Sequence, residues 1–74
     1  MDRKTKALAT EIGKRIRGRR GELKMSQRAM RDATGLTQGF ISHIERGEVE
    51  VCLGSIQAIC ETLGVSIAEL FRGL

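Results

Sequence analysis

Proline, tryptophan and tyrosine are absent from this sequence of 74 residues, and phenylalanine occurs only twice. With 41% hydrophobic residues and no proline, a bundle of helices is favoured over a sheet. No run is long and apolar enough to cross a membrane, and the first ten residues lack the apolar core of a secretory signal. We therefore expect one all-α domain over residues 1–74, with a small core and a cytoplasmic location.

Residues that carry metal or catalytic chemistry are also scarce. Cys52 and Cys60 would lie about 12 Å apart along one helix, which is too far for a disulfide. The single histidine, His43, has no cluster of cysteines or carboxylates around it, and Ser42 beside it would face another direction. No nucleophile is paired with a base, and no Gly-rich phosphate loop is present. We therefore expect no enzyme activity, no metal, no cofactor and no small-molecule ligand.

Positive charge is concentrated in the first half of the chain. Residues 1–31 contain eleven Lys or Arg and three acidic residues, a net of +8, whereas residues 32–74 have a net of −4. A polyanion would therefore meet one end of the molecule first. The alternative is a basic face that is only solvated or attracted to anionic lipid. Membrane binding would need bulky apolar residues beside the charges, and this segment has no aromatic residue.

Two short helices separated by a glycine turn are predicted in the middle of the chain. Ser26 is a suitable cap for a helix over residues 27–34, and Gly35 tolerates the left-handed geometry that ends it. Thr37 can cap a second helix that ends near Gly47. One stripe of this second segment, formed by Leu36, Ile41 and Ile44, can face the first helix. This pattern predicts a helix-turn-helix.

The outer face of the second helix is polar but not uniformly charged. A helix that is merely solvated is expected to carry Glu and Lys at i, i+4 spacing. Here Gln38 stands near the helix start, where its amide can offer a donor and an acceptor to an adenine edge, and Ser42 and His43 follow one turn later. This chemistry is suited to reading base edges in DNA.

Five segments together carry a resemblance to a known family: Met25–Gln27 (MSQ), Thr34–Gln38 (TGLTQ), Phe40–Gly47 (FISHIERG), Leu63–Ser66 (LGVS) and Glu69–Phe71 (ELF). They resemble the helix-turn-helix of the phage repressor and Cro family, also called the XRE family, and the similarity extends from about Ala7 onward. The resemblance implies a five-helix lambda-repressor-like DNA-binding domain. Its helix-turn-helix would cover residues 27–46, with the recognition helix over residues 37–46.

The resemblance also implies roles for individual residues. The residues expected at base edges are Gln38, Gly39, Ser42 and His43, and those expected at the DNA backbone are Gln27, Arg28, Thr37, Phe40 and Arg46. Gly39 departs from the family pattern because it brings no side chain to a position that often reads a base. Arg31 departs from it too, because the family usually has a small residue there, and its stem must either point outward or open the helix crossing.

The first helix is expected from about Thr5 or Ala7 to Arg20, with residues 1–6 frayed. Its buried stripe is Leu8, Ile12 and Ile16, and Arg20 is the next member of that series. A guanidinium on an apolar stripe needs an anion nearby. The resemblance implies that this anion is Glu45 and that the ion pair has a structural role.

After Gly47 we expect a loop over residues 48–51, a fourth helix from about Leu53 to Leu63 with a weak cap at Cys52, and a fifth that opens with a capping box, Ser66–Glu69. Specific binding by so small a domain would require a homodimer on a palindromic DNA site. The residues proposed for the dimer surface are Val49, Val51 and Leu74.

These features predict a sequence-specific regulator that binds double-stranded DNA, of the repressor or controller type. A stand-alone domain of this kind resembles a phage repressor, a restriction–modification controller or an antitoxin. A second hypothesis is a protein-interaction adaptor that uses the same fold. The adaptor would expose an apolar recognition helix, which Gln38, Ser42 and His43 argue against.

Overall fold

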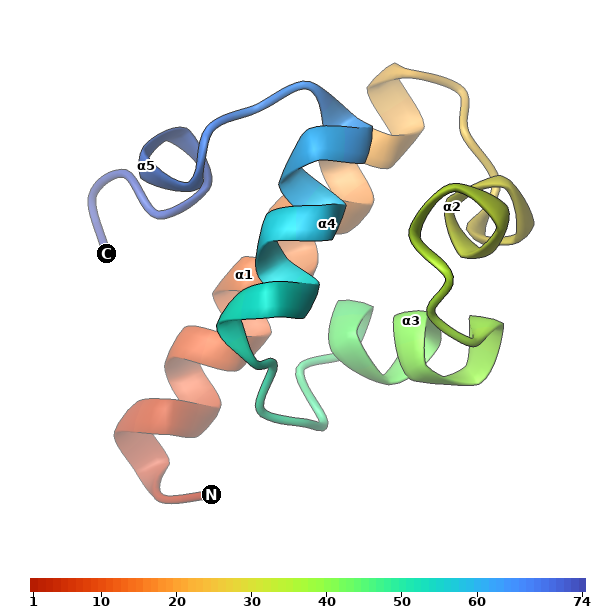
Figure 1. Ribbon diagram of the computed structural model, residues 1–74. Helices are drawn as coiled ribbons and strands as arrows, with labels where there is room; N and C mark the ends of the chain where they lie inside the picture. The colour runs from red at the N-terminus through yellow and green to blue at the C-terminus, as the bar shows by residue number, and fades with distance from the viewer.

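Five helices and no strand make up the computed structural model, which describes residues 1–74. In chain order the helices are α1 (Arg3–Glu22), α2 (Gln27–Thr34), α3 (Gln38–Glu45), α4 (Leu53–Leu63) and α5 (Ile67–Leu70). The long α1 lies alongside α4, while α2 and α3 lie on one side of this pair and α5 on the other (Figure 1). The expected all-α fold with five helices is therefore confirmed. No helix combines the length and the apolar character needed to cross a membrane.

The first helix is longer than predicted at both ends. It begins at Arg3 because the Asp2 carboxylate accepts a hydrogen bond of 2.7 Å from the backbone N–H of Thr5. Residues 3–6, which were expected to fray, are therefore part of the helix. At the other end the helix passes Gly18 and Gly21 and stops at Glu22, because tertiary hydrogen bonds from its arginines outweigh the low helix propensity of glycine.

The core is built from ten buried side chains contributed by all five helices: Ile12, Ile16, Met30, Ile41, Ile44, Ile56, Ile59, Cys60, Leu63 and Leu70. Ile12 and Ile16 follow the predicted stripe of α1, but Leu8 does not, since 42% of its surface remains exposed. Leu8 instead lines an open apolar hollow together with Leu53 and Ile56 of α4.

Two arginines of α1 fasten the C-terminal helices to the rest of the fold. The Arg19 guanidinium donates to the Leu63 carbonyl at the end of α4, over 3.0 Å. That of Arg15 donates to the carbonyls of Leu70 and Arg72, over 3.0 and 2.6 Å. Cations suit these positions because the last carbonyls of a helix have no partner within it. Part of the basic charge in residues 1–31 therefore holds the fold together and is not free for a polyanion.

The predicted starts of the last two helices are both present. Cys52 occupies the cap position of α4 without a side-chain hydrogen bond to the backbone, as its residue type predicts. Ser66 and Glu69 form the complete capping box of α5, with the two reciprocal bonds at 2.9 and 3.1 Å. These caps keep α5 ordered although it has only four residues.

Candidate nucleic-acid interface

The turn between α2 and α3 is fixed by side-chain caps and one left-handed glycine. Ser26 accepts from the Ala29 N–H at 3.0 Å, and Thr37 accepts from the Phe40 N–H at 3.1 Å. Gly35 closes α2 with a φ of 79°. The helix-turn-helix predicted for residues 27–46 is therefore present, with α3 at Gln38–Glu45 between Thr37 and Arg46 as its caps.

Helix α3 has a buried face and an outer face. Ile41 and Ile44 are buried in the core, and Leu36 packs partly against it, as predicted. Four residues of the outer face and its end are exposed and one is half-buried: Gln38, Gly39, His43, Arg46 and, half-buried, Ser42. The four side chains or backbone positions expected at base edges are thus on one accessible surface, and their contact with DNA stays a prediction.

A buried carboxylate anchors the end of α3 to α1. Glu45 is only 7% exposed and accepts two hydrogen bonds from the Arg20 guanidinium, at 2.7 and 2.9 Å. The ion pair implied by the family resemblance is therefore present. Burial alone would raise the pKa of Glu45, but hydrogen bonds from Arg20 and Gln27 and the charges of Arg20 and Arg17 outweigh it and lower that pKa. The pair fixes the orientation of α3 on the body of the molecule.

Gln27 also contacts Glu45 and so belongs to this anchor of α3. This contact was not expected, because the sequence placed Gln27 at a phosphate. Its amide nitrogen donates to the Glu45 carboxylate at 3.1 Å, and the side chain is half-buried. An amide nitrogen carries two hydrogens, so one remains for a phosphate oxygen. Arg28, the next residue, is exposed at the same helix end.

Arg31, Gly39 and Phe40 all fit into the packing of the helix-turn-helix. Arg31 pairs with the neighbouring Asp32, with 2.9 Å from Nε to the carboxylate, so its guanidinium points outward. At Gly39 no heavy atom other than its chain neighbours and its own helix lies within 4 Å of an added Cβ, so the glycine leaves open space on the outer face. Phe40 is half-buried and packs against the core.

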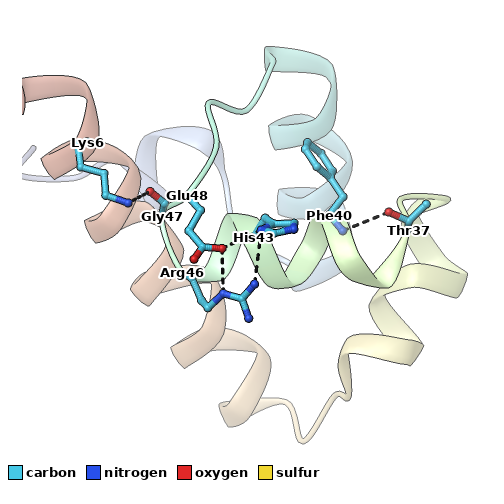
Figure 2. A network of polar contacts seen from close by, with 7 residues as sticks. All are labelled: Lys6, Thr37, Phe40, His43, Arg46, Gly47 and Glu48. Atoms are coloured by element: carbon cyan, nitrogen blue, oxygen red, sulfur yellow. Dashed lines mark hydrogen bonds and ion pairs between the residues drawn. The ribbon is translucent and has the colours of Figure 1, made fainter. Parts of the chain in front are cut away.

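The C-terminal half of α3 carries a polar cluster that the sequence does not predict. Figure 2 shows His43 and Arg46 turned toward Glu48, which lies just beyond the helix. The Glu48 carboxylate contacts His43 Nδ1 at 2.7 Å and accepts from Arg46 Nε at 3.0 Å. These contacts with His43 and then Arg46 lower the pKa of Glu48. Glu48 lies in the loop predicted for residues 48–51, and the only signal in the sequence for its contacts is a carboxylate one residue past Gly47.

Gly47 and Lys6 fix the position of Glu48. Gly47 has a φ of 68°, which turns the chain back over α3, and its carbonyl accepts from Lys6 Nζ of α1 at 2.6 Å (Figure 2). The cluster is therefore part of a tethered turn. The structure has no group of three or more His, Cys, Asp and Glu residues placed to hold a metal, and both cysteines are free thiols.

Comparisons with known proteins agree with this geometry. The helix-turn-helix family model matches residues 16–70. An uncharacterized HTH-type transcriptional regulator of Sinorhizobium fredii is 43% identical over 56 residues, which are 76% of this chain and 29% of that protein. The HTH-type transcriptional regulator PuuR of Escherichia coli is 34% identical over 59 residues, 80% of this chain and 32% of PuuR. The chain thus spans about a third of the length of these relatives.

Two groups of solved structures share the fold. The restriction-modification controller protein C.AhdI of Aeromonas hydrophila superposes with a TM-score of 0.84 and 29% identity, over 88% of this chain and 98% of C.AhdI. The clp gene regulator ClgR of Corynebacterium glutamicum superposes with a TM-score of 0.83 and 28% identity, over 85% of this chain and 67% of ClgR.

Proposed function

Because the chain belongs to the helix-turn-helix family of XRE type, whose matched members are transcriptional regulators, we propose that it binds double-stranded DNA in a sequence-specific manner and regulates transcription. The observation that carries this proposal is the outer face of α3, where Gln38 and His43 are exposed while Ile41, Ile44 and Glu45 anchor the helix from behind. An anchored helix with a polar outer face is suited to entering the major groove.

The dimensions of α3 fit that groove. An α-helix with its side chains is about 10–12 Å in diameter, and the major groove of B-DNA, about 12 Å wide, admits one such helix. In this pose Gln38, Ser42 and His43 face base edges, and Gly39 lets the backbone approach closely because it brings no side chain. The backbone of the DNA is held by Gln27, Arg28, Thr37, Phe40 and Arg46, which fix the register without reading sequence.

We propose that the functional unit is a homodimer on a palindromic site, because one α3 offers too few base contacts for useful specificity. The expected dimer residues Val49 and Val51 are half-buried against the core, and they line the apolar hollow between α1 and the start of α4. Leu53 rises beside this hollow with 79% of its surface exposed, whereas Leu74 is 53% exposed at the chain end. The proposed dimer contact therefore centres on Leu53, with Val49 and Val51 beneath it.

Among regulator types, we favour a repressor or controller. The observation behind this choice is the fold shared with C.AhdI, a restriction-modification controller protein, at a TM-score of 0.84 and 29% identity. An antitoxin or a protein-interaction adaptor would use the same fold. The adaptor is disfavoured because the outer face of α3 presents an amide, an imidazole and a guanidinium and no large apolar side chain.

Selection of bound duplexes from a random DNA pool tests the proposal, because it reports the site, its symmetry and hence the dimer in one measurement. We expect a palindromic consensus with half-site centres about 10 base pairs or a multiple apart. We also expect affinity to fall steeply as salt rises, since several phosphates are neutralised. A pool without enrichment, together with retention that does not change with salt, would contradict DNA binding and favour the adaptor.

A further inference from the structure

We propose that Glu48 is a positioning residue that sets the base preference of His43: it holds the hydrogen of the neutral imidazole on Nδ1, so that Nε2 presents a lone pair and reads an exocyclic amino group of adenine or cytosine. The proposal rests on the proposed function, in which α3 lies in the major groove. It concerns a residue outside α3 that would contact no base itself.

The contact between Glu48 and His43 determines where the imidazole hydrogen lies. The carboxylate oxygen is 2.7 Å from Nδ1. An ionised carboxylate only accepts hydrogen bonds, so Nδ1 must be the donor. The interactions that lower the pKa of Glu48 keep it ionised at neutral pH. In neutral imidazole the second nitrogen, Nε2, is then an acceptor.

Arg46 offers a competing arrangement that the distances disfavour. Its Nη2 lies 3.4 Å from the same Nδ1, and a guanidinium can only donate. Nδ1 would have to be an acceptor for that bond to form. The contact with Glu48 is 0.7 Å shorter than this one and has a charged acceptor, so it fixes the tautomer. Arg46 instead donates a hydrogen bond from its Nε to the Glu48 carboxylate, over 3.0 Å.

The groups around the ring leave Nε2 free for DNA. The His43 side chain is 52% exposed, and Nε2 forms no hydrogen bond within the protein. Glu48 approaches from the turn after α3 and Arg46 from the end of α3, while the Lys6 ammonium of α1 is engaged by the Gly47 carbonyl (Figure 2). Because the two ring nitrogens are on different edges, holding Nδ1 also fixes the direction of Nε2.

An acceptor at this place in the major groove discriminates among bases. Adenine N6 and cytosine N4 carry amino hydrogens there. Guanine presents only acceptors, N7 and O6, and thymine presents the O4 acceptor, while adenine has the N7 acceptor beside its amino group. A lone pair on Nε2 would therefore bind adenine or cytosine and oppose guanine or thymine. The other tautomer, with its hydrogen on Nε2, would bind the acceptors of guanine or thymine or the N7 acceptor of adenine, and it would oppose cytosine. Glu48 thus sets one position of the operator without touching it.

The first measurement is the tautomer of His43 in the DNA-free full chain, by long-range ¹H–¹⁵N correlation spectroscopy. His43 is the only histidine, so its ring signals need no assignment by mutation. At about pH 8, above the usual titration range of histidine, we expect hydrogen on Nδ1 in the unmodified protein. In Glu48→Gln we expect a shift toward the Nε2–H form, because the glutamine amide can donate to Nδ1.

The second measurement is pool selection with the same proteins. In Glu48→Gln we expect guanine or thymine to gain at one symmetry-related position, by about fivefold or more in enrichment relative to cytosine. Glu50→Gln is the matched control: it removes the same charge from the same turn, and Glu50 is exposed and makes no side-chain hydrogen bond. This control shows how much the affinity for any duplex rises when one carboxylate that repels the DNA phosphates is removed.

The outcomes separate this inference from the proposed function. Hydrogen on Nε2 in the unmodified protein, or equal tautomers and equal base preferences in the Glu48→Gln and Glu50→Gln variants, would overturn the inference while leaving DNA binding intact. A pool without any enriched site for the unmodified protein would overturn the proposed function and with it the base-reading role. The tautomer measurement would still show whether Glu48 orients the ring.

Discussion

Gly13 of α1 lies directly against the backbone of Glu45 at the end of α3. A Cβ added at Gly13 would be 2.7 Å from the Glu45 carbonyl oxygen and closer still to that of Ile44. Both partners are backbone atoms, so neither can rotate away. The absence of a side chain at this one position therefore allows α3 to approach α1 closely enough for the Arg20–Glu45 ion pair to form.

We predict that Gly13→Ala destabilises the protein although alanine is the better helix former. Overpacking at a rigid contact costs about 1–3 kcal/mol, more than the roughly 1 kcal/mol that helix propensity returns. Gly18→Ala is the matched control, because Gly18 is in the same helix and an added Cβ there meets nothing within 4 Å. Thermal unfolding should show a lower Tm for Gly13→Ala and a higher one for Gly18→Ala. Equal gains in both variants would contradict the close approach.

The buried carboxylate of Glu45 makes stability depend on acidic pH. Its pKa is lowered in the folded state relative to the usual glutamate value of about 4.3, so the unfolded chain takes up its proton first as pH falls. The contribution of Glu45 is therefore complete above about pH 4.3 and is lost as pH falls through the folded pKa.

Glu45→Gln should lower the free energy of unfolding at neutral pH by about 3 kcal/mol, because it leaves the Arg20 guanidinium without its anion. Urea unfolding of both proteins over a pH series checks this expectation. The difference between them should shrink on acidification. A difference that stays constant down to the most acidic point would show that Glu45 does not titrate with folding. Glu61→Gln, at an exposed site on α4, is the control for loss of one charge.

The parts of the fold that local rules govern could be predicted from the sequence. The bounds of α2, the glycine turn and the cap of α3 follow from Ser26, Gly35 and Thr37, which act on backbone groups within four residues. The buried stripe of α3 follows from helical periodicity. The Arg20–Glu45 pair came from the family resemblance, since 25 residues separate the two side chains and no local rule joins them.

The features that were missed depend on tertiary contacts. Leu8 fits the periodic stripe of α1, but it borders an open apolar hollow and stays 42% exposed. Gly13 looks like an ordinary helix-weakening residue until α3 is packed against it. Glu48 lies in a turn whose path is set by Gly47 and its contact with Lys6, so its position beside His43 could not be read from spacing.

Arg15 of α1 should stabilise the C-terminal segment through its hydrogen bonds to backbone carbonyls. In Arg15→Met the stem is kept, but the bonds to the Leu70 and Arg72 carbonyls are lost. Each such bond contributes about 1 kcal/mol, so amide hydrogen exchange should quicken about tenfold or more from Leu70 to Leu74. Lys14→Met removes one charge from an exposed neighbour and should leave this exchange unchanged. Unchanged exchange in Arg15→Met would contradict the fastening role.

The two ends of α3 should affect DNA binding differently. Gln38→Ala should lower affinity for the selected site by about 1–3 kcal/mol and flatten the preference at one base position. Arg46→Ala should weaken all duplexes alike and reduce the dependence of affinity on salt by about one phosphate contact. Fluorescence anisotropy with the selected site and a scrambled duplex separates the two effects. If Gln38→Ala changed neither affinity nor preference, the proposed register of α3 in the groove would be wrong.

Leu53 should control the proposed dimer. It is the first residue of α4 and is 79% exposed, so Leu53→Glu places a charge on the apolar surface without harming the helix, whose N-terminus favours an acidic residue. We expect this variant to sediment as a monomer at concentrations where the unmodified protein is a dimer, and to lose affinity for a two-half-site operator more than for a single half-site. Ala33→Glu, which adds the same charge to an exposed position of α2, should leave the sedimentation unchanged. A Leu53→Glu protein that remained dimeric would place the contact elsewhere, because an unpaired carboxylate buried in an apolar interface costs several kcal/mol.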